Sequence, residues 1–145
     1  MTKRVEIEWK EGLKFISKKG TNEIVMNSTI AMNSPEDEEL VKNNFAPMEL
    51  LLVSLAGCTG MDVISILKKM RQDVKNFKVI VTGERAEEHP KVYTKINIHY
   101  HFEGNGIEKD KVERAIELSY TKYCSVSAML KKSCDMSYTY EIKNS

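Results

Sequence analysis

A nearly unbroken apolar run in the middle of the chain limits its possible folds more than any other feature. The run extends from Phe45 to Leu67 and is typical of one long helix, which can begin at Pro47 because proline is well suited to a first helical turn. Apolar side chains occupy nearly every face of this helix, residues 47–70. A helix that is apolar all round must be covered on all sides. One small domain can hardly provide that cover, so the sequence predicts a homodimer with this helix at its centre.

The composition is that of a soluble globular protein. The 145 residues suffice for one domain with a sizeable core. The 22 basic and 21 acidic residues leave a net charge of +1, which gives no support for a nucleic-acid or membrane-surface partner. The first residues contain no apolar stretch of signal-peptide type, and Glu49 and Asp62 would make a membrane span costly. We therefore expect a cytoplasmic protein that binds neither membrane nor nucleic acid.

The region before the helix has two parts. In residues 1–32, Val5, Ile7 and Trp9 alternate with polar residues, and turn signals follow, which predicts a β-meander of three short strands. Residues 33–46 form a polar connector with a short acidic run. Such a connector is either a solvated loop with at most one helical turn or a mobile cover over a site.

The region after the helix, residues 76–145, contains two longer alternating runs, an amphipathic helix over about 108–123, a short helix over 125–131 and a last strand. The order of these elements predicts a single α+β domain over residues 1–145, with largely antiparallel sheets.

The sequence contains three cysteines, Cys58, Cys124 and Cys134, in no CxxC pair and in no Cys/His cluster of zinc spacing. We therefore expect no metal site and no disulfide framework. His99 and His101 point to the same face of a predicted strand, where we expect solvent rather than a metal ion. Cys134 begins the last predicted strand, and we expect it to have a structural role.

Cys58 lies on one face of the long helix with Met48, Leu51, Leu55 and Asp62. The apolar neighbours and the negative charge of Asp62 disfavour a thiolate on Cys58. A reactive thiol needs a helix N-terminus or a nearby cation, which the rest of the fold would have to supply. Residue pattern alone leaves two interpretations open for each cysteine: a reactive thiol, or a small buried hydrophobic side chain.

Two motifs together resemble the OsmC/Ohr family of osmotically inducible and organic-hydroperoxide-resistance proteins. The first runs from Pro47 to Leu52 and on through Gly57-Cys58-Thr59, and the second is Tyr123-Cys124-Ser125-Val126 after an amphipathic helix. The resemblance covers essentially the whole chain. It implies an OsmC-like fold, in which an intertwined homodimer packs two long central helices between β-sheets. It also implies two sites at the dimer interface, each with both cysteines close together.

The resemblance further implies thiol-dependent reduction of organic hydroperoxides in oxidative-stress defence. Cys58 would be the peroxidatic thiol and Cys124 the resolving thiol, with an external dithiol as reductant and no cofactor. Active relatives carry an arginine in the N-terminal strands and a glutamate early in the helix. Met48 aligns with that glutamate, beside Glu49, and Lys14 is the possible charge partner. The alternative is a non-catalytic small-molecule-binding or redox-sensing dimer that lacks peroxidase activity.

Overall fold

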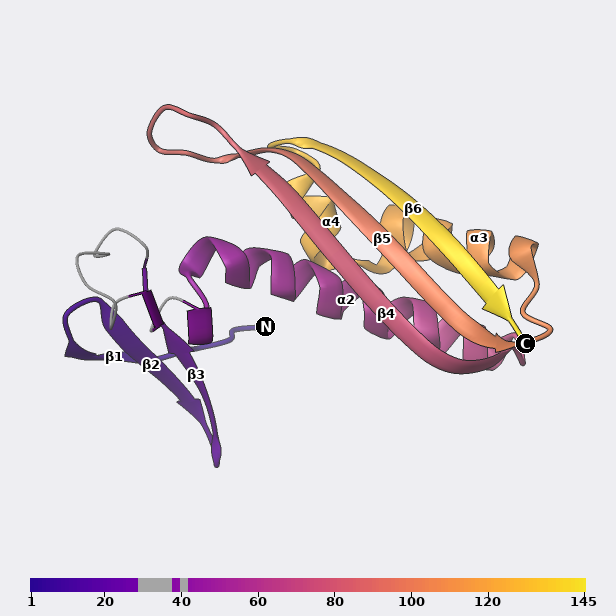
Figure 1. Ribbon diagram of the computed structural model, residues 1–145, viewed down its shortest axis with the longest axis horizontal. Coiled ribbons are helices and arrows are strands. Elements are labelled where there is room, and N and C mark those ends of the chain that lie inside the picture. Colours follow the sequence, from indigo (N-terminus) through magenta and orange to yellow (C-terminus); the bar gives the residue numbers. More distant parts are fainter. Residues whose placement is uncertain (29–37, 40–41) are drawn as a thin grey trace. The chain divides into compact units, whose positions relative to one another are not determined.

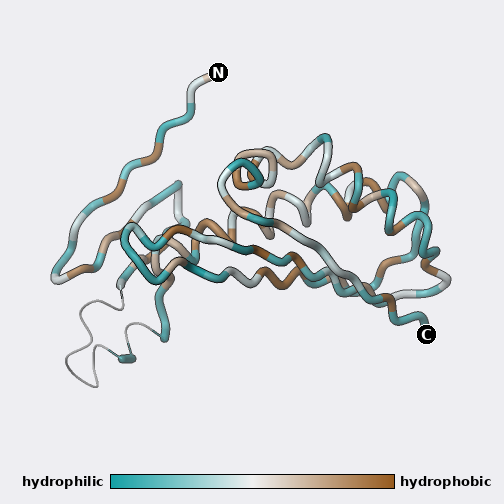
Figure 2. The backbone as a smooth tube through the Cα atoms, turned by 90° about the horizontal axis from the view of Figure 1, so that it is seen from above, coloured by the Kyte–Doolittle hydropathy of each residue, from teal (hydrophilic) through white to brown (hydrophobic). Residues whose placement is uncertain are grey.

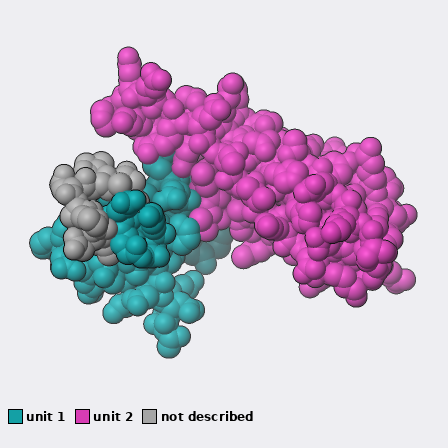
Figure 3. Space-filling view, viewed as in Figure 1, with its two compact units in different colours: residues 1–51 teal, residues 52–145 magenta. Residues whose placement is uncertain are grey.

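The computed structural model describes residues 1–28, 38–39 and 42–145, which form two compact units, Met1–Leu51 and Leu52–Ser145 (Figure 3). The boundary between the units falls within the long helix, so the single domain stays a prediction. The alternatives for the connector, residues 33–46, fall mostly outside the described residues. Of its acidic run, Glu38 and Glu39 are described, and both are helical and exposed.

The first unit contains the predicted meander. Its strands are β1 (Ile7–Glu11), β2 (Lys14–Lys19) and β3 (Asn22–Met26), paired antiparallel in that order. Gly12 and Gly20 have φ angles of +52° and +62° in the two turns, a conformation that glycine adopts without steric cost. Several apolar side chains of this sheet stay exposed in the single chain, among them Trp9 at 64% and Ile24 at 49%.

The second unit is built on a sheet of three strands, β4 (Asp73–Arg85), β5 (Tyr93–Asn105) and β6 (Asp135–Asn144), in that order (Figure 1). β4 and β5 pair antiparallel, as predicted, whereas β5 and β6 pair parallel. The difference arises because helices carry the chain back along the sheet between β5 and β6, and a crossover of this kind is what a parallel pair requires. With this exception, the α+β prediction is confirmed.

Four helical segments accompany the sheet of the second unit. The long helix α2 spans Pro47–Lys69, in agreement with the predicted 47–70. The predicted helix over 108–123 is divided into α3 (Lys109–Leu118) and a π-helical turn, η2 (Ser119–Tyr123), and the short α4 (Ser125–Leu130) follows. In Figure 1, α3 and α4 lie along the same side of the sheet.

The core lies between this sheet and its helices. Polar and apolar residues alternate along the strands (Figure 2), and β5 buries Ile96, Ile98, Tyr100 and Phe102 on one face. The long helix α2 presents residues at intervals of four to the core: Leu55, Thr59, Val63 and Leu67. A side chain added at Gly60 would lie 3.4 Å from Val79 of β4, so α2 passes close to the sheet there.

Much of α2 remains uncovered within one chain. Val53 and Met61 are 46% and 73% exposed. The helix is long and apolar enough to span a membrane by length and composition, and 22% of its most apolar stretch is buried in the chain. One such helix is weak evidence for a membrane span, because the central helix of a soluble protein has the same composition. The predicted cytoplasmic location stays a prediction.

Candidate functional site

Two cysteines and one carboxylate meet in the second unit. The Sγ atoms of Cys58 and Cys124 and a carboxylate oxygen of Asp62 all lie within 4.8 Å of one another. Cys58 and Asp62 are one turn apart on α2 and therefore share a face, whereas Cys124 lies between η2 and α4. Both thiols are free, Cys58 half-buried and Cys124 buried. Cys134, also free, donates instead to the carbonyl oxygen of Leu130 at 3.4 Å.

A π-helical turn positions Cys124. The backbone N–H of Cys124 donates to the carbonyl oxygen of Ser119 at 2.8 Å, which is a bond across five residues rather than four. The wider turn holds one more residue than an α-helical turn, and such turns are common at functional sites. It ends at Cys124, whose extended backbone then begins α4.

The environment of Cys124 favours the neutral thiol. Only 2% of the residue is exposed, and this burial raises the pKa of the Cys124 thiol above its usual range. The Ser127 N–H donates to Cys124 Sγ at 3.4 Å and lowers the pKa in part, while the neighbouring Cys58 raises it. The net effect is a raised pKa, so Cys124 carries its proton near neutral pH.

A chain of buried hydroxyl groups ends on Asp62. Ser119 Oγ donates to Asp62 Oδ2 at 2.9 Å, Thr59 Oγ1 lies 2.8 Å from Ser119 Oγ, and Tyr100 Oη lies 2.6 Å from Thr59 Oγ1. A carboxylate only accepts, and each hydroxyl has one hydrogen. The order of donation is therefore Tyr100 to Thr59, Thr59 to Ser119, and Ser119 to Asp62.

The three hydroxyl groups of this chain are shielded from solvent, with residue exposures of 0–1%. Burial raises the pKa of Tyr100 to about 12, so its phenol keeps the proton that it donates. These hydrogen-bonded hydroxyl groups connect β5, α2 and η2, and they fix the orientation of the Asp62 carboxylate beside the two thiols.

Sequence reasoning missed these three hydroxyl residues. A signal was present, because Thr59, Ser119 and Tyr100 are polar groups at positions where the apolar pattern of each element predicts the core. Buried hydroxyl groups need partners, and three of them in one core indicate a network.

The other residues predicted to line the site are less closely grouped. Leu55 is fully buried one turn before Cys58, whereas Leu51 is 40% exposed. Lys14 belongs to β2 of the first unit, and its role as a charge partner stays a prediction.

The first turn of α2 uses Glu49 for capping. Its carboxylate accepts a hydrogen bond of 2.9 Å from the backbone N–H of Ala46, as in the reciprocal half of a capping box. This contact stabilises the start of the helix and gives Glu49 a structural role. Met48 lies beside it, half-buried, in the same turn.

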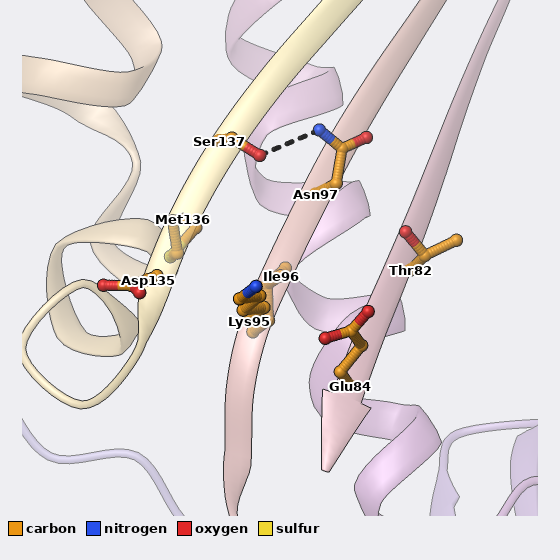
Figure 4. A pocket seen from close by; sticks show the side chains of 8 residues that line it. All are labelled: Thr82, Glu84, Lys95, Ile96, Asn97, Asp135, Met136 and Ser137. Atoms are coloured by element: carbon orange, nitrogen blue, oxygen red, sulfur yellow. Dashed lines mark hydrogen bonds between the residues drawn. The ribbon is translucent and has the colours of Figure 1, made fainter.

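The outer face of the sheet carries a shallow cavity that is separate from the cysteines. Figure 4 shows its polar lining from three strands: Thr82, Glu84, Lys95, Asn97, Asp135 and Ser137. The cavity has a volume of about 220 Å³. Lys95 and Asn97 alternate along β5 with the buried residues, so they point away from Tyr100 and the thiols.

The two histidines of β5 share this outer face. His99 Nδ1 lies 2.7 Å from the Thr139 hydroxyl, and His101 lies between two carboxylates, 2.6 Å from Glu141 and 3.1 Å from Glu103. The hydrogen bonds that His101 donates to Glu103 and Glu141 raise the pKa of His101. The H-x-H pair thus forms part of a cross-strand polar cluster.

Comparison with known proteins agrees with this architecture. The family described as OsmC-like protein matches residues 37–139. Protein YhfA from Escherichia coli K12 is 36% identical over 140 residues, which are 96% of this chain and 97% of YhfA. The crystal structure of a hypothetical protein from Aquifex aeolicus VF5 is 39% identical, with a TM-score of 0.85 over 100% of this chain and 98% of that chain.

A more distant structure belongs to an organic hydroperoxide resistance protein from Elizabethkingia anophelis. It has a TM-score of 0.66 and 12% identity, and the match covers 100% of this chain and 99% of that chain. At this identity the likeness shows a shared fold alone. The predicted OsmC-like fold of the chain is therefore confirmed, while the intertwined homodimer stays a prediction.

Proposed function

The chain belongs to the OsmC-like protein family, and on this premise we propose that it reduces organic hydroperoxides with the thiol pair Cys58 and Cys124. The observation that carries the proposal is the approach of the two Sγ atoms to within 4.8 Å, because a small movement brings them to bonding distance. The fold shared with organic hydroperoxide resistance proteins also supports a role in peroxide resistance or redox chemistry.

The two thiols differ in ways that suit different steps. Cys58 is the more exposed of the two and is the thiol that a hydroperoxide can reach. Its thiolate attacks the O–O bond, which forms a sulfenic acid on Cys58 and releases the alkoxide. Cys124 then gives up its proton and its sulfur attacks the Cys58 sulfenic acid, so that a disulfide forms and the proton leaves with the hydroxide as water.

Asp62 is the acceptor for the proton of Cys58 in this scheme. Its carboxylate lies beside both thiols and is held in place by Ser119. It takes the proton of Cys58 before the attack and returns it to the departing alkoxide, which leaves as the alcohol. This assigns the negative charge at Asp62 a role that the sequence pattern alone did not indicate.

The catalytic cycle closes when an external dithiol reduces the disulfide and becomes oxidised itself. The Ser127 N–H that donates to Cys124 Sγ stabilises negative charge on that sulfur. When the reductant attacks Cys58, this hydrogen bond partly offsets the burial that makes Cys124 a poor leaving thiolate. No cofactor takes part in these steps.

We propose that the active form is the predicted homodimer. Each unit exposes apolar side chains that a second copy can cover: Val53 and Met61 of α2 in the second unit, and Trp9 of the first sheet in the first unit. An interface of this kind would also provide an apolar environment for the organic part of the hydroperoxide.

The second candidate function is the redox-sensing or ligand-binding dimer without peroxidase activity. Two observations favour it: the raised pKa of Cys124, and the carboxylate of Asp62 within 4.8 Å of both thiols, which opposes a second negative charge. A sensor would need only slow, reversible oxidation of the same pair.

Oxidation by one equivalent of cumene hydroperoxide tests the proposal. In a Cys134→Ser background, mass spectrometry without reductant should show the loss of two hydrogens and a peptide that links Cys58 to Cys124. The Cys124→Ser variant should stop at the sulfenic acid, which dimedone traps. Stopped-flow mixing should show oxidation of Cys58 much faster than that of free cysteine. An equal rate would exclude the peroxidase and leave the sensor.

A further inference from the structure

We propose that Cys58, Asp62 and Cys124 also form a binding site for a thiophilic divalent cation of the Zn²⁺ class, and that the bound ion blocks the thiol pair. The binding depends on the geometry of the three side chains and is independent of the proposed peroxide chemistry. Only the blocking effect rests on that proposed function.

The spacing of the ligands suits one metal ion. Cys58 and Asp62 stand at positions i and i+4 of α2, the spacing at which two ligands on one helix can share an ion. Cys124 provides a third ligand from a separate element. Zn²⁺ binds sulfur at about 2.3 Å and carboxylate oxygen at about 2.0–2.2 Å, so two ligands of a tetrahedral ion lie about 3.6–3.8 Å apart.

The ligand atoms observed within 4.8 Å of one another therefore need only small side-chain movements to reach this geometry. Three protein ligands leave one position for water, as in open zinc sites. Cys58 and Asp62 are half-buried rather than sealed, which gives an ion access to the cluster.

The surroundings hold two of the ligands in place. Ser119 Oγ donates to Asp62 Oδ2 at 2.9 Å, and the hydroxyl chain behind it extends to Tyr100. The Ser127 N–H donates to Cys124 Sγ at 3.4 Å. Hydrogen bonds from outer groups orient the ligands of metal sites and contribute to affinity.

The donor set indicates the class of ion. Two sulfurs and one oxygen favour Zn²⁺ and chemically similar ions, whereas Mg²⁺ and Ca²⁺ prefer oxygen alone. The sequence predicts no metal site because Cys58 and Cys124 are far apart along the chain. The fold provides the missing proximity. Once both thiolates bind an ion, neither can attack a hydroperoxide, so the ion must leave before Cys58 reacts.

Titration of the reduced Cys134→Ser protein with Co²⁺ as a spectroscopic probe tests the site. We expect one Co²⁺ per chain, a sulfur-to-cobalt charge-transfer band, and displacement of Co²⁺ by Zn²⁺. Cys58→Ser and Cys124→Ser should lose the band. Asp62→Asn should bind more weakly by about tenfold or more, and Ser119→Ala by about tenfold. The matched control, His99→Gln/His101→Gln, removes two potential ligands from the outer sheet face and should bind normally.

A comparison of two redox states of one protein needs no further substitution, so a misfolded variant cannot account for its result. The same protein, oxidised to the disulfide with diamide, should lose Co²⁺ binding and regain it on reduction. Binding that persists in the disulfide form or in both serine variants would overturn the metal site. So would the absence of a sulfur-to-cobalt band.

The proposed peroxidase function and the proposed metal site can be refuted independently of each other. If Co²⁺ binds as expected but metal-free protein forms no disulfide with cumene hydroperoxide, the proposed function fails and the metal site stands. If the metal-free protein reacts and the zinc-loaded protein reacts equally fast, the blocking effect is refuted.

Discussion

Replacing Thr59 by valine would remove the central hydroxyl of the buried chain and almost nothing else. The two side chains have nearly the same shape, so the substitution leaves no sizeable cavity. In the native protein the Thr59 hydroxyl lies 2.6 Å from Tyr100 Oη and 2.8 Å from Ser119 Oγ. Thr59→Val therefore isolates the contribution of this hydrogen-bonded network to stability.

The expected loss follows from the hydrogen bonds and from the groups left behind. Each lost hydrogen bond contributes about 1 kcal/mol net, and a buried donor left without a partner costs about 1–3 kcal/mol. Tyr100 is fully buried, so its O–H would lose its acceptor. Because these contributions overlap, we expect Thr59→Val to lower the free energy of unfolding by about 2–4 kcal/mol.

Urea denaturation of the reduced protein, at one fixed protein concentration, measures this difference. The matched control is Thr94→Val, which removes an exposed strand hydroxyl that donates to the Glu84 carbonyl at 3.1 Å, and should cost less than about 1 kcal/mol. In the double variant Thr59→Val/Tyr100→Phe no phenol is left without an acceptor. Its loss of unfolding free energy should therefore be about 1–2 kcal/mol smaller than the sum of the two single losses. Equal effects of Thr59→Val and Thr94→Val, or strictly additive effects of the pair, would refute the hydroxyl chain.

Two further predictions concern packing and pH. Leu67→Ala should lower the free energy of unfolding by about 2–5 kcal/mol because the side chain is fully buried, whereas Met129→Ala, at a residue 72% exposed, should cost less than about 1 kcal/mol in the same urea assay. The glutamates Glu103 and Glu141 raise the pKa of His101, so this histidine stabilises the fold below its unfolded pKa of about 6.5 and loses that effect as the pH rises through its folded value. His101→Gln should therefore destabilise the protein more at about pH 6 than at about pH 9, and a difference independent of pH would contradict the ion pairs.

The elements that the sequence predicted well are those with a regular pattern. The apolar run identified α2 almost to the residue, and the alternation of Ile96 and Ile98 with polar neighbours identified β5. Such patterns reflect local geometry, with a period of two for strands and 3.6 for helices, so they can be recognised without knowledge of the fold. The parallel pairing of β6 cannot be recognised in this way, because alternation is the same in parallel and antiparallel strands.

The candidate site was predictable only in part for a related reason. The family motifs singled out Cys58 and Cys124, but their proximity depends on the crossover between β5 and β6. The π-helical turn was also unpredictable, since Ser119 to Tyr123 continue the amphipathic pattern of α3 and carry no glycine or proline to mark a change. The buried hydroxyl chain depends on both features.

Ser119 connects the two halves of the site. Its hydroxyl donates to Asp62 on α2, and its carbonyl oxygen accepts the π-helical hydrogen bond from Cys124. A regular α-helical turn would pair the Ser119 carbonyl with residue 123 and would rotate Cys124 by about 100° relative to the helix axis. The extra residue in η2 thus allows one side chain to orient the carboxylate while its own backbone positions the thiol beside it. Ser119 therefore supports the proposed proton transfer through Asp62, and the proposed metal site through both Asp62 and Cys124.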